Sequence, residues 1–208
     1  MPLDESSPWG RPGHAYGRSK QMVEQMLADE VDADPSLSVA VLRYFNPVGA
    51  HPTALLGEAP TGTPNNLFPY IGQVAAGERG HLAIFGGDYP TPDGAGMRDY
   101  VHVMDLARGH VLALEYLIDR PGLHLWNLGG GRAYSVLEVV NSFAVASGRD
   151  IPCQIVARRP GDTACYWADI SKAARELDWA PQFTLEDMIC HAWAWQQVMS
   201  GEARLQPR

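Results

Sequence analysis

Tyr16-Gly17-Arg18-Ser19-Lys20 is the stretch from which the rest of this chain can be interpreted. It opens a predicted helix that runs to about residues 29–31. A separation of four residues places Tyr16 and Lys20 on one helical face, about one turn apart. An ammonium beside a phenol stabilises the phenolate, so Tyr16 is a candidate general acid or base. Lys20 has further N–H groups to donate to a ribose hydroxyl.

The alternative is a tyrosine and a lysine that stand four residues apart by chance. Two features favour the functional pair. Lysine is scarce, because Lys20 and Lys172 are the only two in the sequence. The helix also carries two apolar lines, which are Val23, Leu27 and Val31 on one and Met22 and Met26 on the other. We therefore expect this helix to be buried on two sides.

The composition limits the class of protein. A length of 208 residues with 46% hydrophobic and 19% charged residues is typical of one globular domain or two small ones. The net charge of -8 argues against a nucleic-acid partner. The sequence shows no transmembrane stretch and no signal peptide, and Cys153, Cys165 and Cys190 have no C-x-x-C spacing. We expect a cytoplasmic protein with reduced thiols, no membrane partner and no metal site.

Residues 38–45 form an apolar run rich in β-branched residues, which predicts a strand buried on both faces of a parallel sheet. Asn46-Pro47-Val48-Gly49 ends the run. Ligands of open α/β sheets bind beyond the carboxyl ends of such strands, so Asn46 is a candidate ligand residue. The alternative is an ordinary turn asparagine.

Further elements follow a long loop at residues 49–64. Asn65-Asn66 predicts the N-cap of a helix over residues 67–76, with an anion site at the helix start as the less usual alternative. We also expect strands near residues 82–86, 98–103, 123–128 and 155–156. Helices are expected from Asp105, Ser135 and Ser171 as caps, and over residues 185–199. The triplet at residues 129–131 is not a dinucleotide fingerprint, because no G-x-G-x-x-G follows.

Arg98, Arg159 and Asp162 stand in predicted loops that contain Gly and Pro, within an acidic chain. Guanidinium groups bind phosphate oxygens through paired hydrogen bonds, and a carboxylate can accept hydrogen bonds from a ribose diol. Solvated surface charges are the usual alternative. Together with Tyr16 and Lys20, these residues make a nucleotide diphosphate the most economical ligand.

Several of these motifs resemble the extended short-chain dehydrogenase/reductase family, and within it the UDP-glucose 4-epimerases. The stretches that carry the resemblance are residues 16–20 (YGRSK), 42–52 (LRYFNPVGAHP), 64–67 (PNNL), 98–107 (RDYVHVMDLA) and 166–169 (YWAD). The match extends from about Leu3 to Gln196. The block that starts at Arg43 is more specific than Y-x-x-x-K, which the whole superfamily shares.

The resemblance implies a role for each candidate residue. It implies that Tyr16 is the catalytic base, that Lys20 is its partner on the nicotinamide ribose, and that Phe45 packs beside NAD. The implied substrate contacts are Asn46, Asn66, Leu67, the uracil-binding strand Ala83, Ile84 and Phe85, the diphosphate ligands Arg98 and Arg159, the ribose ligand Asp162, and Tyr166. A bulky residue at the position of Tyr166 is associated in the family with exclusion of N-acetylated sugars.

The implied reaction interconverts UDP-galactose and UDP-glucose. Hydride leaves sugar C4 for bound NAD, the keto-sugar rotates, and hydride returns to the other face. The implied fold is α/β: a remnant of a doubly wound NAD-binding Rossmann sheet in residues 1–50, and a smaller UDP-sugar domain in residues 51–208. Elements near residues 97–130 would return to pack on the cofactor domain. The full-length family chain would form a homodimer through the Tyr16 helix.

Three alternatives stay open at this point. The chain could be a catalytically incomplete module that binds a UDP-sugar. It could be a related nucleotide-sugar dehydratase or decarboxylase, whose acidic pair would lie upstream of these residues. It could also be an interaction protein that pairs through Met22 and Met26, although that face fits the family's dimer equally well.

The chain departs from the family pattern on the cofactor side. Family members have a glycine-rich turn that binds the NAD pyrophosphate and an assisting Ser or Thr further upstream of the tyrosine, and the resemblance matches no residue of this chain to either feature. The resemblance places Met1 inside the family's chain, shortly before Tyr16. We therefore expect the carboxyl-terminal portion of a longer chain, with an unpaired sheet edge. A truncated gene, a fragment or a mis-set start codon would each produce such a carboxyl-terminal portion.

Residues 1–208 alone are expected to have little or no epimerase activity, because most of the family's NAD contacts would be missing. Conversion of UDP-galactose by the purified chain with added NAD is the measurement, and steady turnover would contradict the expectation. A glycine-rich βαβ segment in the coding frame upstream of Met1 would indicate a mis-set start.

Overall fold

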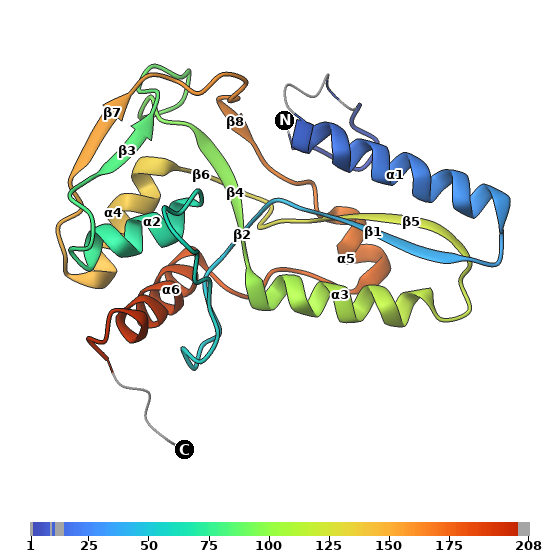
Figure 1. Ribbon diagram of the computed structural model, residues 1–208. Helices are drawn as coiled ribbons and strands as arrows, with labels where there is room; N and C mark the ends of the chain where they lie inside the picture. The colour runs from blue at the N-terminus through green and yellow to red at the C-terminus, as the bar shows by residue number, and fades with distance from the viewer. Residues whose placement is uncertain (1, 9, 11–14, 204–208) are drawn as a thin grey trace.

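The computed structural model describes residues 2–8, 10 and 15–203, which form an α/β structure with two parts, and the chain crosses between these parts at several points (Figure 1). The helices are α1 (Ala15–Ala33), α2 (Leu67–Ala75), α3 (Val103–Leu117), α4 (Val136–Ser147), α5 (Ser171–Leu177) and α6 (Leu185–Met199). The strands are β1 (Ser38–Tyr44), β2 (Asn46–Val48), β3 (Leu82–Phe85), β4 (Met97–His102), β5 (Gly122–Leu128), β6 (Ala133–Ser135), β7 (Cys153–Val156) and β8 (Cys165–Tyr166).

The first part is a layered unit built on the parallel pair β1 and β5. Their register runs from Ser38 opposite Gly122 to Tyr44 opposite Leu128. Helix α1 lies on one side of the pair and α3 on the other (Figure 1). The core on the α3 and α5 side contains Val101, Ala113, Trp126, Leu128, Ala173, Leu177 and Trp179. This packing brings the carboxyl ends of β1 and β5 together, and the backbone N–H of Phe45 donates to the carbonyl of Leu128 at 3.1 Å.

Helix α1 differs from the expectation, because none of its residues is buried. The side chains of Met22 and Met26 are 59% and 64% exposed. In the described part of the chain, α1 packs on β1 and β5 from one side. A polar contact holds it there: Arg43 donates to both carboxylate oxygens of Glu24, at 2.9 and 2.6 Å. The prediction of a helix buried on two sides is therefore wrong for this structure.

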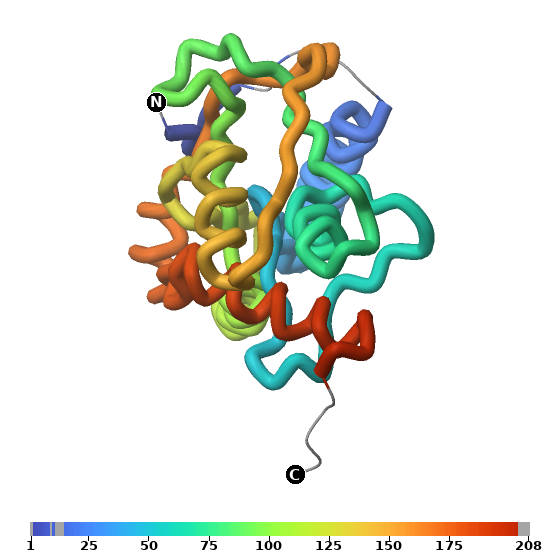
Figure 2. The backbone as a smooth tube through the Cα atoms, turned by 90° about the vertical axis from the view of Figure 1, so that its left-hand side faces the viewer, coloured from blue at the N-terminus to red at the C-terminus, as the bar shows by residue number. Residues whose placement is uncertain are grey.

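The second part surrounds a larger apolar core. Strand β4 pairs with β2 and β8 in parallel and with β6 in antiparallel orientation, and β3 pairs in parallel with β7. Helices α2, α4 and α6 pack against one another beside these strands, and Figure 2 views them from that side. The core includes Phe68, Ile71, Ile84, Tyr100, Val139, Phe143, Leu185, Ile189 and Trp193.

The strand predicted over residues 38–45 is divided in the structure. It ends at Tyr44, and Asn46 already pairs with Tyr100 of β4 in another sheet. No residue of β1 is fully buried, so the prediction of burial on both faces is wrong. The residues thought to end the strand form β2 instead, because their partner β4 passes beside them.

The helix starts confirm two predicted N-cap positions and correct two. Ser135 caps α4 in a capping box with Glu138. Helix α3 begins before Asp105, and its N-cap is His102, whose ring accepts from the N–H of Met104 at 3.0 Å. Asn66 is the N-cap residue of α2, as predicted, but its side chain makes no capping hydrogen bond and donates to Glu58 at 2.7 Å instead. Ser171 is the first residue of α5 rather than its cap.

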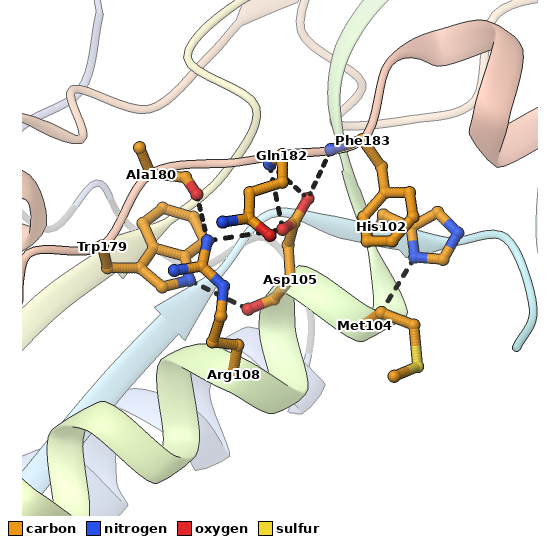
Figure 3. Close-up of polar contacts among 8 residues, drawn as sticks. All are labelled: His102, Met104, Asp105, Arg108, Trp179, Ala180, Gln182 and Phe183. Atoms are coloured by element: carbon orange, nitrogen blue, oxygen red, sulfur yellow. Dashed lines mark hydrogen bonds and ion pairs between the residues drawn. The ribbon is translucent and has the colours of Figure 1, made fainter. Parts of the chain in front are cut away.

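Asp105 instead holds two later segments of the chain through the polar contacts shown in Figure 3. Its buried carboxylate accepts hydrogen bonds from the backbone N–H groups of Gln182, at 3.0 and 2.9 Å, and of Phe183, at 3.1 Å. Its carbonyl accepts from the indole N–H of Trp179 at 2.9 Å. Asp105 therefore fixes the segment that leads into α6 against the start of α3.

Candidate functional site

A cavity of about 340 Å³ lies where β1 and β5 end. It is lined by Leu3, Asp4, Ser7, Pro8, Gly10, Arg43, Tyr44, Phe45, Asn127 and Tyr166. Phe45 and Tyr166 are the two predicted residues in this lining, and their ring centroids are 6.0 Å apart. Tyr16 and Arg159 are not part of the lining.

Arg98 continues this site along β4. Parallel pairing of β4 with β8 places Arg98 opposite Tyr166, and its guanidinium carbon lies 4.9 Å from the Tyr166 ring centroid. The guanidinium donates to the Thr163 carbonyl at 2.8 Å and lies 3.6 Å from the carboxylate of Asp162. Arg98 therefore stands in β4, in agreement with the strand expected near residues 98–103, and its placement in a loop is wrong. The structure brings it together with Asp162, Tyr166 and Phe45 in one row.

Arg159 lies at the end of the β3–β7 pair, in the predicted loop. Its guanidinium carbon is 3.7 Å from the ring centroid of Phe85, the last residue of β3. Ala83 and Phe85 are half-buried on the same face of the strand, whereas Ile84 is buried in the core. The preceding residue Arg158 is engaged elsewhere, because it donates to the Asp88 carboxylate at 2.7 Å.

The asparagines divide between two environments. Asn46 is half-buried at the start of β2, and its amide donates to the carbonyl of Asp99 at 2.7 Å. This bond fixes the Asn46 side chain beside the Arg98 strand. Asn66 is exposed and bonded to Glu58, and Leu67 is half-buried as the first residue of α2.

Tyr16 and Lys20 form the expected neighbouring pair in the first turns of α1. The Lys20 ammonium is 5.3 Å from the Tyr16 ring centroid, and the tyrosine side chain is 70% exposed. A short connection joins α1 to β1, so the two elements run in opposite directions (Figure 1). The amino-terminal end of α1 consequently lies toward the carboxyl end of β1, where Phe45 follows.

Asp99 is a central residue that the sequence interpretation did not select. It is completely buried, and its carboxylate accepts from the backbone N–H groups of Gly130, Gly131 and Ala168, at 2.5, 3.1 and 2.9 Å. The signal for it was the glycine triplet, because consecutive backbone N–H groups in such a turn need an acceptor.

Burial shifts the pKa values of Asp99 and His102 in opposite directions. Burial raises the pKa of Asp99 to about 6, although the three backbone N–H groups oppose this shift. Burial, and then the nearby His191, lower the pKa of His102 to about 4. The ring of His102 is stacked on Phe183, with centroids 4.1 Å apart.

These shifts predict a pH dependence of stability. As the pH falls from 6 to 4, folded Asp99 binds a proton before the unfolded chain does, so this site gains about 3 kcal/mol of stability. From pH 6.5 to 4, unfolded His102 binds a proton before the folded state does, so this site loses about 3 kcal/mol. Asp99→Asn should therefore lose about 3 kcal/mol more unfolding free energy between pH 7 and pH 4 than the wild type.

Urea unfolding at the two pH values measures this difference, in which the contributions of other groups cancel. His102→Asn, which retains an oxygen for the helix cap, should lose about 3 kcal/mol less than the wild type. Equal pH dependence in all three proteins would contradict the assignment.

Residues 2–8, 10 and 15–203 offer neither a metal centre nor a membrane-spanning helix. These residues contain no group of three or more His, Cys, Asp or Glu side chains that could hold a metal ion. None of the helices in this described part is both long enough and apolar enough to cross a membrane.

Comparison with protein families gives a match over more than half of the chain. Residues 1–129 match the model of the NAD dependent epimerase/dehydratase family. A UDP-glucose 4-epimerase of Yersinia pestis is 54% identical over 196 residues, which is 94% of this chain and 58% of that protein. The chain therefore spans less than two thirds of the length of this relative.

Solved structures give the same result. UDP-glucose 4-epimerase from Stenotrophomonas maltophila, with bound NAD and formylated UDP-arabinopyranose, has a TM-score of 0.93 at 50% identity, covering 97% of this chain and 60% of that one. UDP-glucose 4-epimerase from Bifidobacterium longum, in complex with NAD+ and UDP, has a TM-score of 0.91 at 49% identity, covering 95% and 58%. The α/β fold and the Rossmann-like layering of the first part agree with these structures.

Proposed function

This chain belongs to the NAD dependent epimerase/dehydratase family, and on that premise we propose that it serves in the interconversion of UDP-galactose and UDP-glucose by NAD-dependent epimerisation at sugar C4. The observation that carries the proposal is the row formed by Phe45 and Tyr166, at the carboxyl ends of β1 and β8, with Arg98 beside them near the amino end of β4. UDP-glucose 4-epimerases as relatives support the same reaction.

The substrate would lie along this row. The guanidinium groups of Arg98 and Arg159 would donate paired hydrogen bonds to the oxygens of the diphosphate. Asp162, 3.6 Å from Arg98, accepts from the uridine ribose hydroxyls. The uracil lies against the strand of Ala83, Ile84 and Phe85, where the buried Ile84 would contribute backbone rather than side chain. Asn46, Asn66 and Leu67 complete the contacts, and the bulk of Tyr166 disfavours N-acetylated sugars.

The exposed groups on α1 suit a nicotinamide riboside. Tyr16 and Lys20 present a hydroxyl and an ammonium at one end of the helix, and Phe45 presents a half-buried aromatic ring at the end of β1. Lys20 would hold the ribose hydroxyls, and Phe45 would pack beside the ring. NAD, when bound, supplies the hydride acceptor and donor for C4.

The protein's own chemistry is then a proton transfer. Tyr16 removes the proton of the sugar 4-hydroxyl and later returns it. Lys20, with its ammonium 5.3 Å from the Tyr16 ring centroid, stabilises the negative charge of the phenolate.

Calorimetric titration of the purified chain with UDP-glucose and with dTDP-glucose tests the proposal. We expect UDP-glucose and UDP-galactose to bind, and dTDP-glucose to bind about tenfold more weakly, because Asp162 loses the 2′-hydroxyl as a hydrogen-bond donor. An absent heat signal with both UDP-sugars, or equal affinity for the deoxynucleotide, would count against the substrate assignment.

Assembly and location are part of the same proposal. We propose a cytoplasmic homodimer in which α1 pairs with its copy through the exposed Met22 and Met26. Sedimentation equilibrium should show dimers, and Met26→Glu should shift them toward monomers. A monomeric wild type at high concentration would contradict the dimer.

A further inference from the structure

We propose that Asp99 is a positioning residue, which holds the carboxyl end of β5 and the segment after β8 in the arrangement that the UDP-sugar site requires. This inference rests on the proposed function. Asp99 itself is completely buried, so it acts through the segments that it holds rather than on the ligand.

Three segments meet at this one residue. Its carboxylate accepts from Gly130 and Gly131, which follow β5, and from Ala168, which follows β8. Its carbonyl accepts from the side-chain amide of Asn46, which follows β1. Ligands of open α/β folds bind beyond the carboxyl ends of parallel strands, and Asp99 connects these ends to β4.

The residues next to each contact are those proposed to bind the substrate. Arg98 immediately precedes Asp99 in β4, and Tyr166 stands two residues before Ala168. Asn46 is bonded to Asp99 directly. Tyr166 of β8 is paired with Arg98 of β4. Loss of the charge on the Asp99 carboxylate would therefore displace Tyr166 relative to Arg98.

The glycine turn is fitted closely to the carboxylate. A Cβ atom at Gly129 would lie 2.6 Å from the Asp99 Oδ2 atom, and one at Gly130 would lie 2.5 Å from the Tyr100 carbonyl. Only glycine allows this approach, so the turn and the carboxylate form one unit.

The energetics also favour a functional role. No ion pair involving Asp99 is found among the described residues, and its charge is stabilised by backbone N–H groups alone. A buried carboxylate without a cationic partner is costly, and such groups are concentrated at functional sites.

Asp105 provides a matched control. It too is a buried aspartate whose carboxylate accepts from backbone N–H groups, those of Gln182 and Phe183 (Figure 3). It secures the start of α6, whereas Asp99 secures the proposed site. Asp105 differs in one respect, because its carboxylate also lies 3.5 Å from the Arg108 guanidinium. Asp99→Asn and Asp105→Asn therefore both remove a buried carboxylate charge that accepts from backbone N–H groups, but only Asp99→Asn does so beside the proposed site.

The experiment measures UDP-glucose affinity by calorimetry at pH 8, at a temperature where circular dichroism shows both variants folded. We expect Asp99→Asn to raise the Kd about tenfold or more, and Asp105→Asn to leave it within about twofold. If the two substitutions raised the Kd equally, or if Asp99→Asn left it unchanged, the inference would be overturned. Binding of UDP-glucose by the wild type would in that case still support the proposed function. A wild type that does not bind overturns both.

A second measurement needs no variant and so covers the case in which Asp99→Asn does not fold. Amide hydrogen exchange of the wild type is followed with and without saturating UDP-glucose. The inference predicts slower exchange at Gly130, Gly131 and Ala168 in the complex, with unchanged exchange at Gln182 and Phe183. Unchanged exchange at the amides of Gly130, Gly131 and Ala168 would overturn it.

In Asp99→Asn, the Gly130 and Gly131 amide protons should also move upfield, because they lose a charged acceptor.

Discussion

Replacement of Arg98 with Met is expected to weaken UDP-glucose binding by about 100-fold, or roughly 2–3 kcal/mol, because a buried charge-assisted contact to the diphosphate is lost. The guanidinium is already held in place by the Thr163 carbonyl and by Asp162, so little side-chain entropy is lost when the ligand binds. Calorimetric titration with UDP-glucose measures the change.

Arg158→Met is the matched control for this prediction. Arg158 stands near the same end of the molecule, but it is bonded to Asp88 and stacked over Tyr89, 4.1 Å from the ring centroid. Its replacement removes one positive charge without removing a proposed ligand contact. Equal losses in the two variants would indicate a nonspecific charge effect and contradict the assignment of Arg98.

Replacement of Asp105 with Ala is expected to lower the unfolding free energy by about 3–5 kcal/mol. The carboxylate is completely buried and accepts the N–H groups of Gln182 and Phe183, which would keep no acceptor in the variant. Because this segment leads into α6, the loss also loosens the core that contains Trp193. Urea unfolding followed by circular dichroism measures the effect.

Asp187→Ala gives the comparison for that stability loss. Asp187 belongs to the Thr184 capping box at the exposed start of α6, so its replacement should cost only about 1 kcal/mol. A loss of similar size in the two variants would show that Asp105 acts as an ordinary helix-terminus carboxylate.

Elements with strong local signals could be predicted from the sequence. The helix at Tyr16, the Ser135 cap and the closing helix α6 are predicted and are present, because periodicity and caps are encoded within a few neighbouring residues. Strands β2, β6 and β8 have only two or three residues each, and their partner β4 lies far away in the sequence. No local pattern could reveal them.

The contacts of the candidate site also divide into those encoded by neighbouring residues and those that depend on residues far apart in the sequence. The contact between Tyr16 and Lys20 follows from helical spacing alone. The contact between Arg98 and Tyr166 depends on strand pairing across more than sixty residues, so the sequence did not predict it, and Tyr166 became a candidate only through resemblance to a family. Asp99 was missed because its neighbours, Gly130 and Ala168, are contributed by segments that fold back from later in the chain.

A crystal structure of this chain with UDP-glucose tests the central claim most directly. We expect diphosphate oxygens within hydrogen-bonding distance of both the Arg98 and the Arg159 guanidinium groups, with the uracil against β3 and the sugar toward Phe45 and Tyr166. A nucleotide bound elsewhere, or Arg98 and Arg159 opening onto separate surfaces with no ligand between them, would contradict it.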